Sequence, residues 1–226
     1  QICMLTAEAA ILRALEVKGY KADVTAGLSL GEYGALIACG ALSRKDAFAL
    51  VRKRGIYMQE AVPEGGAMAA VLALDTAQIE EACKKTEGIV SIANYNCPGQ
   101  IVITGEEKAV AAAGELCKEA GAKRVVPLKV SGPFHSAMLK GAGEKLGEEL
   151  KHVTVHTPAI PYVANVTADY VTKEEEIKPL LEKQVSSSVR WQQTIERLIA
   201  DGADKFVEIG PGKTLTGFMR KINRDV

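Results

Sequence analysis

The sequence has few of the residues that build metal sites and disulfide frameworks. It holds three histidines, and its five cysteines are widely spaced with no Cys-x-x-Cys pair. An odd number of scattered cysteines is typical of proteins in a reducing compartment, and so few histidines disfavour metal chemistry. We therefore expect a cytoplasmic protein without a metal site.

The sequence also lacks a surplus of charge and any long apolar run. Lysine plus arginine equals aspartate plus glutamate at 28 each, so the charge balance does not indicate nucleic acid as a partner. No apolar run approaches the ~20 residues needed to span a membrane, and no signal peptide is visible, so we expect no membrane partner. A hydrophobic content of 47% instead predicts a globular core, in one domain or in a domain with an insertion.

An initiator methionine and a helix cap are missing at the start. Gln1 leads directly into an amphipathic pattern that ends near Gly19. Helices usually begin at a capping residue such as Ser, Thr, Asp or Asn. This beginning predicts a chain that is truncated at its N-terminus or is one piece of a longer protein.

A Gly-Leu-Ser-Leu-Gly motif lies between a strand-like run at 22–26 and a helix-like run at 30–38. A serine becomes a useful nucleophile when a sharp strand-to-helix turn holds its hydroxyl exposed, and the two glycines give such a turn room. The backbone N–H of Leu30, at the start of the helix, is then placed to stabilise an oxyanion. The motif also arises by chance in a chain with 21 glycines, but its surroundings favour a nucleophile elbow at Ser29.

Residues 67–130 have a pattern of their own. We expect these elements in order: strand 67–74, helix 76–86, strand 89–95, strand 100–104, helix 106–120 and strand 124–130. Cys97-Pro98-Gly99-Gln100 suits a type II turn between the two middle strands. This βαββαβ order is ferredoxin-like. It predicts a small subdomain at 63–131, inserted into a larger unit formed by 1–62 and 132–226.

The larger unit alternates helices with strand-like runs. Ser43, with Asp46 three residues later, resembles a capping box that opens a helix to about Glu60. Beyond the insertion we expect a helix at 136–150, a strand-like alternation at 152–156, a helix at 191–200, a strand at 206–209, a turn at 210–213 and a last short helix. The polar stretch 172–188 has no predicted element. The fold class is α/β: an α/β-hydrolase-like large domain with a parallel sheet and an inserted ferredoxin-like subdomain.

A serine nucleophile needs a base, and the three histidines are the candidates. His152 and His156 alternate with valines, which is typical of a solvated face. His135 lies in a Gly-Pro-Phe-His loop at the predicted return from the insertion, and loops at domain junctions commonly carry catalytic groups. We favour His135. Asp23 and Asp46 are possible orienting acids, and nothing in the sequence selects either.

Arg54 is unusual because it interrupts an apolar face. In helix 44–60, Ala47, Val51 and Met58 fall on one stripe, and Arg54 lies on the same stripe. A guanidinium on an inward face is unfavourable unless it meets an anion. It is either one half of a structural salt bridge or a bidentate clamp on a substrate carboxylate.

Together these residues resemble the malonyl-CoA:acyl carrier protein transacylases and the related acyltransferase domains of fatty acid and polyketide synthases. The likeness covers essentially the whole chain. Five motifs in the right order carry it: Gly27-Leu-Ser-Leu-Gly-Glu-Tyr33, Arg54-Gly with Met58-Gln-Glu60, Asn94-Tyr-Asn-Cys-Pro-Gly-Gln100, Gly132-Pro-Phe-His135 and Glu208-Ile-Gly-Pro-Gly-Lys213.

The resemblance implies a role for each candidate. Ser29 is the acylated nucleophile, His135 is its base, and Arg54 binds the malonyl carboxylate. The family orients its histidine with a backbone carbonyl, here that of Gln184, so no acid is required. Three further residues are implied at the substrate: Phe134, which matches the form seen in malonyl-selective members, Asn96 and Asn165.

The sequence departs from the family at two points. Leu28 stands where the family usually has a histidine before the serine. No segment matches the family's N-terminal strand, whose Gly-Gln-Gly motif gives the other oxyanion N–H.

The implied reaction is ping-pong transfer of malonyl from its coenzyme A thioester to the phosphopantetheine thiol of acyl carrier protein, with no cofactor. We expect the carrier protein to dock on basic residues near the last strand of the insertion: Lys123, Arg124 and Lys129. These residues also fit a simple solvated strand edge. The alternative functions are a serine hydrolase or thioesterase, against which Arg54 argues, and a non-catalytic docking module for carrier protein.

Overall fold

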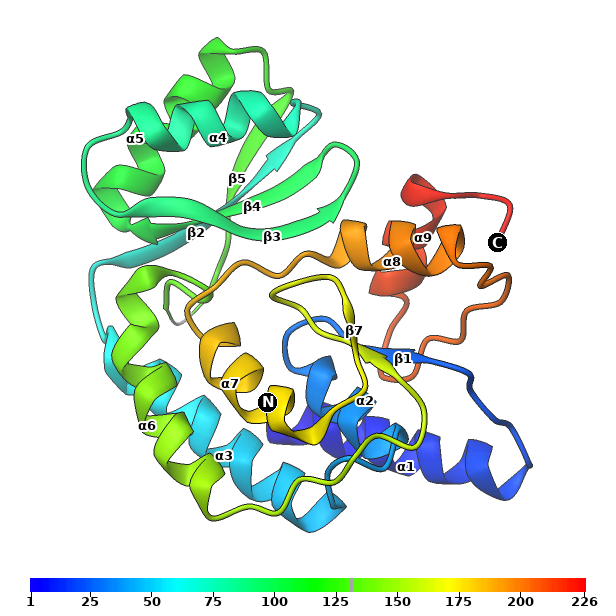
Figure 1. Cartoon of the computed structure of the whole chain (residues 1–226). Coiled ribbons are helices and arrows are strands. Elements are labelled where there is room, and N and C mark those ends of the chain that lie inside the picture. Colours follow the sequence, from blue (N-terminus) through cyan, green and yellow to red (C-terminus); the bar gives the residue numbers. More distant parts are fainter. Residues whose placement is uncertain (131) are drawn as a thin grey trace.

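The computed structural model describes residues 1–130 and 132–226. Two α/β parts lie one above the other in Figure 1, each built around its own sheet. Residue 131, where the predicted insertion ends, lies outside the described residues, and the predicted domain limits remain a prediction.

The larger part holds a short sheet surrounded by helices. Its elements are α1 (Ile2–Val17), β1 (Thr25–Ala26), α2 (Gly31–Ala38), α3 (Arg44–Ala61), the 3₁₀ turn η1 (Ala137–Leu139), α6 (Lys140–Lys151), β6 (Tyr162–Val163), β7 (Tyr170–Val171), α7 (Glu174–Gln184), α8 (Trp191–Ala200) and α9 (Thr214–Ile222). Strand β1 pairs in parallel with β6, as expected for an α/β unit, and β7 adds to β6 in the antiparallel direction.

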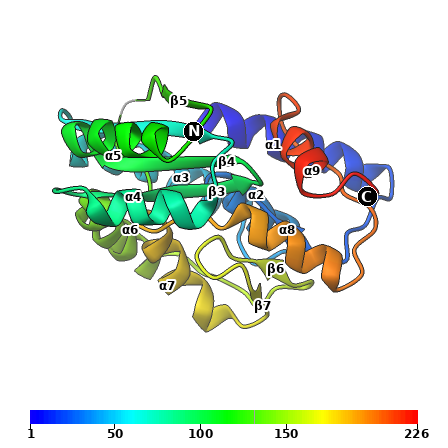
Figure 2. The ribbon, with the colours of Figure 1, turned by 90° about the horizontal axis from the view of Figure 1, so that it is seen from above.

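The smaller part is the ferredoxin-like subdomain. Its elements follow the expected order: β2 (Gly66–Leu72), α4 (Thr76–Lys85), β3 (Val90–Cys97), β4 (Gln100–Glu106), α5 (Glu107–Glu119) and β5 (Arg124–Pro127). The strands form an antiparallel sheet in the order β3-β4-β2-β5. Both helices cover the outer face of this sheet (Figures 1 and 2). The predicted fold class is confirmed.

The two parts are joined by backbone contacts at the edge of β3. Val189 donates its N–H to Ala93 O at 2.8 Å and accepts from Tyr95 N–H at 2.9 Å. At the other junction, a Cβ on Gly66 would overlap the ring of Pro133, which lies two residues before His135. The histidine loop therefore packs directly against the first residue of the inserted sheet.

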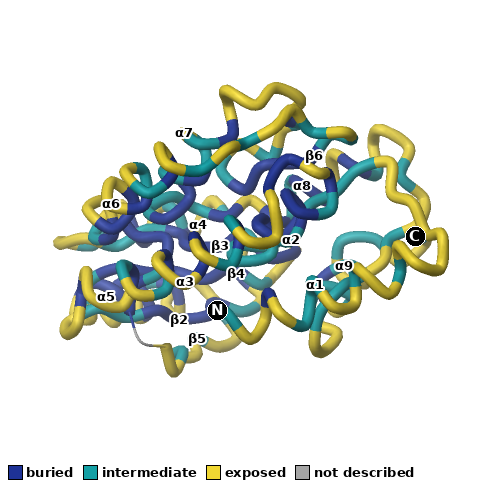
Figure 3. The backbone as a smooth tube through the Cα atoms, turned by 90° about the horizontal axis from the view of Figure 1, so that it is seen from below, coloured by how far each residue is buried: buried dark blue, intermediate teal, exposed yellow. Residues whose placement is uncertain are grey.

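The core of the larger part lies between α2, α3, α6 and α7. The N-cap half of the predicted capping box is present: Ser43 Oγ accepts from Asp46 N–H at 3.0 Å at the start of α3, and the Asp46 side chain accepts from the Ser43 hydroxyl at 2.7 Å. The apolar stripe of α3 is buried, and α3 packs against α6. Figure 3 shows this inner layer as dark blue tube beneath exposed outer turns. Three of these helices also carry buried polar residues: Glu32 on α2, Arg54 on α3 and Gln184 on α7.

Three expectations about secondary structure need correction. Residues 152–156 form no strand: His152 and His156 are exposed as expected, but the segment runs as a loop, held where His156 N–H bonds Ala41 O at 2.9 Å. Residues 206–209 pair with no strand among the described residues, and Glu208 instead caps α9 by accepting from Leu215 N–H and Thr216 N–H. The stretch 172–188 holds helix α7, which the sequence analysis missed.

None of the helices in the described part of the chain is both long enough and apolar enough to cross a lipid bilayer.

Candidate active site

Ser29 lies on a strained turn between β1 and α2. Its φ is 54°, a left-handed conformation that side chains other than glycine rarely adopt. A Cβ at Gly27 would overlap the carbonyl of Gly31, so the turn closes only with glycine at position 27. A Cβ at Gly31 would meet no atom among the described residues. The close approach of the two backbones at this elbow therefore explains one of the two motif glycines.

Asn165, in the turn between β6 and β7, binds the backbone of this elbow through its side chain. Its side chain is buried, its Oδ1 accepts from Ser29 N–H at 2.6 Å, and its Nδ2 donates to Gly27 O at 2.6 Å. The side chain therefore holds the backbone on both sides of the turn. We predicted a substrate contact for Asn165, and these bonds give it a positioning role at the elbow.

Ser29 and His135 lie 106 residues apart in the sequence and meet in the structure. Ser29 Oγ lies 2.7 Å from His135 Nε2, and His135 Nδ1 lies 2.9 Å from the main-chain oxygen of Gln184. A carbonyl only accepts, so Nδ1 carries the proton and Nε2 is left to accept from the serine hydroxyl. The arrangement is a nucleophile, a base and an orienting carbonyl. His135 also has a positive φ, 60°, so both partners sit on strained backbone.

Burial keeps the imidazole neutral. Burial, and then the nearby Arg54 cation, lower the pKa of His135 to about 4. An imidazole with this pKa is unprotonated at pH 7 and available as a base. The two carboxylates weighed as orienting acids lie elsewhere, because Asp46 is in the first turn of α3, where its Oδ2 accepts from Ser43 Oγ, and Asp23 is exposed.

Arg54 reaches the site from α3. The residue is 2% exposed, and Ala47, Val51 and Met58 beside it on the stripe are buried as expected. Its Nη2 donates to Ser29 Oγ and to Gln184 Oε1, both at 3.1 Å, and its Nη1 donates to Gln1 Oε1 at 2.6 Å. The guanidinium therefore lies against the nucleophile itself.

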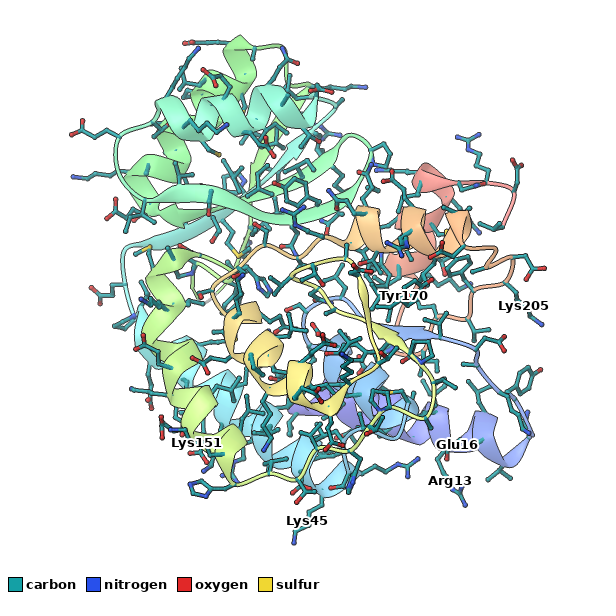
Figure 4. All side chains as sticks on the ribbon, viewed as in Figure 1. Arg13, Glu16, Lys45, Lys151, Tyr170 and Lys205 are labelled. Carbon is teal, nitrogen blue, oxygen red and sulfur yellow. The ribbon has the colours of Figure 1, made fainter. Side chains whose placement is uncertain are left out.

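In the part of the chain that the structure describes, this guanidinium has no carboxylate partner of its own. Arg54 takes part in none of the ion pairs found within 1–130 and 132–226, and its Nε is buried without a hydrogen-bond partner. By contrast, Arg13 and Glu16 on α1 form an ion pair at 3.3 Å near the surface. Both residues are labelled in Figure 4. An internal salt bridge, one of the two explanations for Arg54, is therefore not found among the described residues.

Three features of this site were not expected from the sequence. Gln1 holds Arg54 through its side-chain oxygen. The side-chain amide of Gln184 contacts Arg54, the Ser29 carbonyl and Glu32. Glu32 is fully buried on α2. One signal was available for Glu32, because it shares a helical stripe with the buried Ala35 and Leu36.

The remaining predicted site residues lie at different distances from this centre. Leu30 N–H donates to no acceptor in the described segments, so it is free beside Ser29. Phe134 is partly buried and packs against the cores of both parts of the molecule. Asn96, on β3, is 7% exposed and lines a cavity of about 1850 Å³ that adjoins the elbow at Leu28. Lys123, Arg124 and Lys129 are exposed at β5, on the edge of the inserted sheet.

Comparison with known proteins agrees with this geometry. The family model described as "Acyl transferase domain" matches residues 1–225. A Bacillus subtilis (strain 168) protein named malonyl CoA-acyl carrier protein transacylase is 50% identical over 228 residues, which cover 99% of this chain and 72% of that protein. The protein of the same name from Escherichia coli (strain K12) is 46% identical over 226 residues, covering 98% and 73%.

Solved structures show the same likeness. The crystal structure of MCAT from Streptococcus pneumoniae superposes with a TM-score of 0.95 at 50% identity, covering 98% of this chain and 73% of that one. A complex of a type II PKS acyl-carrier protein with its malonyl-transacylase matches with a TM-score of 0.95 at 45% identity, covering 98% and 73%. Because the family model matches residues 1–225 and the structure has the serine elbow with its paired histidine, the chain belongs to the acyl transferase domain family.

Proposed function

We propose that this protein transfers a malonyl group from malonyl-CoA to the phosphopantetheine thiol of acyl carrier protein, through a malonyl ester on Ser29. One observation carries the assignment: a buried guanidinium without an ion-pair partner lies 3.1 Å from the hydroxyl of an activated serine. An acyl group that ends in a carboxylate would place its reacting carbonyl at the serine and its charge at Arg54. The names of the relatives fit the same reaction.

In the first half-reaction Ser29 Oγ attacks the thioester carbonyl. His135 Nε2 takes the hydroxyl proton, while its Nδ1–H stays bonded to the Gln184 carbonyl. Negative charge develops on the carbonyl oxygen, and the free N–H of Leu30 is placed to stabilise it. The carbon–sulfur bond then breaks, and coenzyme A leaves with the proton held by His135.

The second half-reaction runs the same steps with a new thiol. His135 takes the proton of the phosphopantetheine thiol, whose sulfur attacks the malonyl ester. The bond from the carbonyl carbon to Ser29 Oγ breaks, and the proton returns to the serine. Every proton is carried by the one histidine, so the proposed mechanism uses no metal or redox cofactor.

The carrier protein is proposed to dock beside β5. Lys123, Arg124 and Lys129 are exposed there, shortly before the histidine loop in the sequence. An acidic partner would be steered by such a basic edge, mainly through the rate of encounter. We infer that the malonyl carrier protein serves fatty acid synthesis. All five cysteines are free thiols, which supports the proposal of a reducing, cytoplasmic location.

A malonyl release assay tests the transferase against the serine hydrolase that could use the same elbow. Malonyl-CoA is incubated with the protein, with and without phosphopantetheinylated carrier protein, and free malonate and malonyl carrier protein are measured. We expect malonyl carrier protein to form and little malonate to appear. Steady release of malonate, unaffected by carrier protein, would show a hydrolase. Apo-carrier protein, which lacks the thiol, is the matched control.

A further inference from the structure

Glu32 is a buried carboxyl group that the mechanism above does not use. It is 0% exposed at the start of α2, three residues after the nucleophile. One of its oxygens, Oε2, accepts from Gln184 Nε2 at 2.7 Å and from Asn165 N–H at 3.3 Å. Both donors belong to residues that contact the catalytic groups. Glu32 therefore lies directly behind the site without touching Ser29 Oγ or His135.

The side chain of Gln184 connects Glu32 to the substrate-binding group. Its Nε2 donates to Glu32 Oε2 and, at 2.8 Å, to the carbonyl of Ser29, while its Oε1 accepts from Arg54 Nη2 at 3.1 Å. The Gln184 side chain is fully buried, so water does not compete for these hydrogen bonds.

The chemistry of the partners allows the amide only one orientation. An amide can rotate by half a turn and exchange its oxygen with its nitrogen. Arg54 has donors only, so it requires the oxygen of Gln184. The ionised carboxylate of Glu32 accepts only, so in this form it requires the nitrogen. In the reversed orientation both contacts would be repulsive, because two donors would meet at Arg54 and two acceptors at Glu32.

We propose that Glu32 is a positioning residue for substrate selection: it fixes the Gln184 amide, and the amide oxygen aims the Arg54 guanidinium at the substrate carboxylate. This inference rests on the proposed malonyl transfer. The electrostatics support it. Burial lowers the pKa of Arg54, and the nearby Glu32 charge opposes this shift although, among the described residues, it forms no ion pair with the guanidinium. Burial raises the pKa of Glu32 to about 7. In its ionised form Glu32 stabilises the buried cation without a direct contact and therefore occupies none of the Arg54 N–H groups.

Two substitutions at position 32 separate positioning from packing. Glu32→Gln keeps an oxygen that can accept from both Gln184 and Asn165, whereas Glu32→Leu keeps the volume and removes the acceptor. Steady-state transfer to carrier protein is measured with malonyl-CoA and with acetyl-CoA. We expect Glu32→Leu to raise KM for malonyl-CoA about tenfold, with a smaller change in kcat and in acetyl transfer. Glu32→Gln should stay within about threefold of wild type in malonyl KM.

Two controls complete the test. Glu149, on α6, accepts hydrogen bonds from Lys53 and Tyr57 of α3 and forms no hydrogen bond with the described residues of the site. Glu149→Leu therefore removes a hydrogen-bonded carboxylate outside the site. It should leave the malonyl to acetyl ratio as in wild type. Gln184→Met keeps the main-chain carbonyl that His135 needs, and it must give the same rise in malonyl KM if Glu32→Leu does not fold.

The inference is overturned if Glu32→Leu and Gln184→Met lower malonyl and acetyl transfer in the same proportion, because a packing defect would act on both. It is also overturned if both variants keep the malonyl preference of the wild type. In either case wild-type malonyl transfer would stand, and the proposed function with it. A wild type that accepts no malonyl group would overturn the proposed function and this inference together.

Discussion

Replacing Arg54 with alanine should change substrate choice much more than stability. A charged pair loses about 2–5 kcal/mol when one partner is truncated and the other is left unpaired. Malonyl transfer should therefore fall by roughly 30- to 4,000-fold, each 1.4 kcal/mol being a factor of ten. Acetyl-CoA brings no carboxylate and leaves the wild-type guanidinium unpaired, so acetyl transfer should hold or rise.

The effect on stability follows from the contacts of Arg54. Its removal leaves the side-chain oxygens of Gln1 and Gln184 without this donor, at a loss of about 1 kcal/mol for each bond. It also removes a buried cation that has no ion pair, which is favourable. The two effects oppose each other, so the net change should be about 1–2 kcal/mol. In a chain of this size, where 1 kcal/mol shifts Tm by about 2–4 °C, Tm should then fall by about 2–8 °C.

The assay measures Tm and the two transfer rates on one preparation of each variant. Arg54→Met, which keeps most of the side-chain volume, should give the same loss of malonyl preference and thereby exclude a cavity effect. Arg52→Ala, on the exposed face of the same helix, should behave as wild type. A sharp drop in Tm together with equal losses for both substrates would refute the clamp and establish Arg54 as a structural residue.

Three further predictions follow from the same geometry. The acylation rate should fall on the acid side with a midpoint near the His135 pKa of about 4, because the base is lost only when the imidazole is protonated; a midpoint near 6.5 in a still-folded protein contradicts this. Gly27→Ala should lower the free energy of unfolding by at least about 3 kcal/mol, since its Cβ overlaps backbone. Gly141→Ala, whose Cβ meets no atom, should be neutral or stabilising by about 0.5 kcal/mol in the same denaturant titration. Replacing Lys123 and Arg124 with glutamate should raise KM for carrier protein at low salt, while the rate of acylation by malonyl-CoA stays unchanged. An unchanged KM for carrier protein would show that these residues form a solvated strand edge with no role in docking.

The sequence was most informative where structure is set by neighbouring residues. The elbow at Ser29 and the buried stripe that carries Arg54 each depend on residues within a few turns, and both are present in the structure. The pairing of Ser29 with His135 depends on the fold, and the position of the histidine loop at the junction of the two parts was enough to favour it.

Other features could not be obtained from local pattern. The carbonyl that orients His135 is main chain, so no residue type marks it, and only the family resemblance indicated Gln184. The residue types at 206–209, Phe-Val-Glu-Ile, are typical of a strand. A strand needs a partner, however, and the sequence does not show one. Helix α7 was missed because its charged residues and Pro179 obscured an apolar stripe at Ile177 and Leu181.

The most direct test of the account is the mass of the intact protein after brief exposure to malonyl-CoA. The account predicts that the wild type gains the mass of one malonyl group, that peptide mapping places it on Ser29, and that phosphopantetheinylated carrier protein removes it. Ser29→Ala should gain nothing under the same conditions. A Ser29→Ala protein that still gains the malonyl mass would contradict the assignment of the nucleophile.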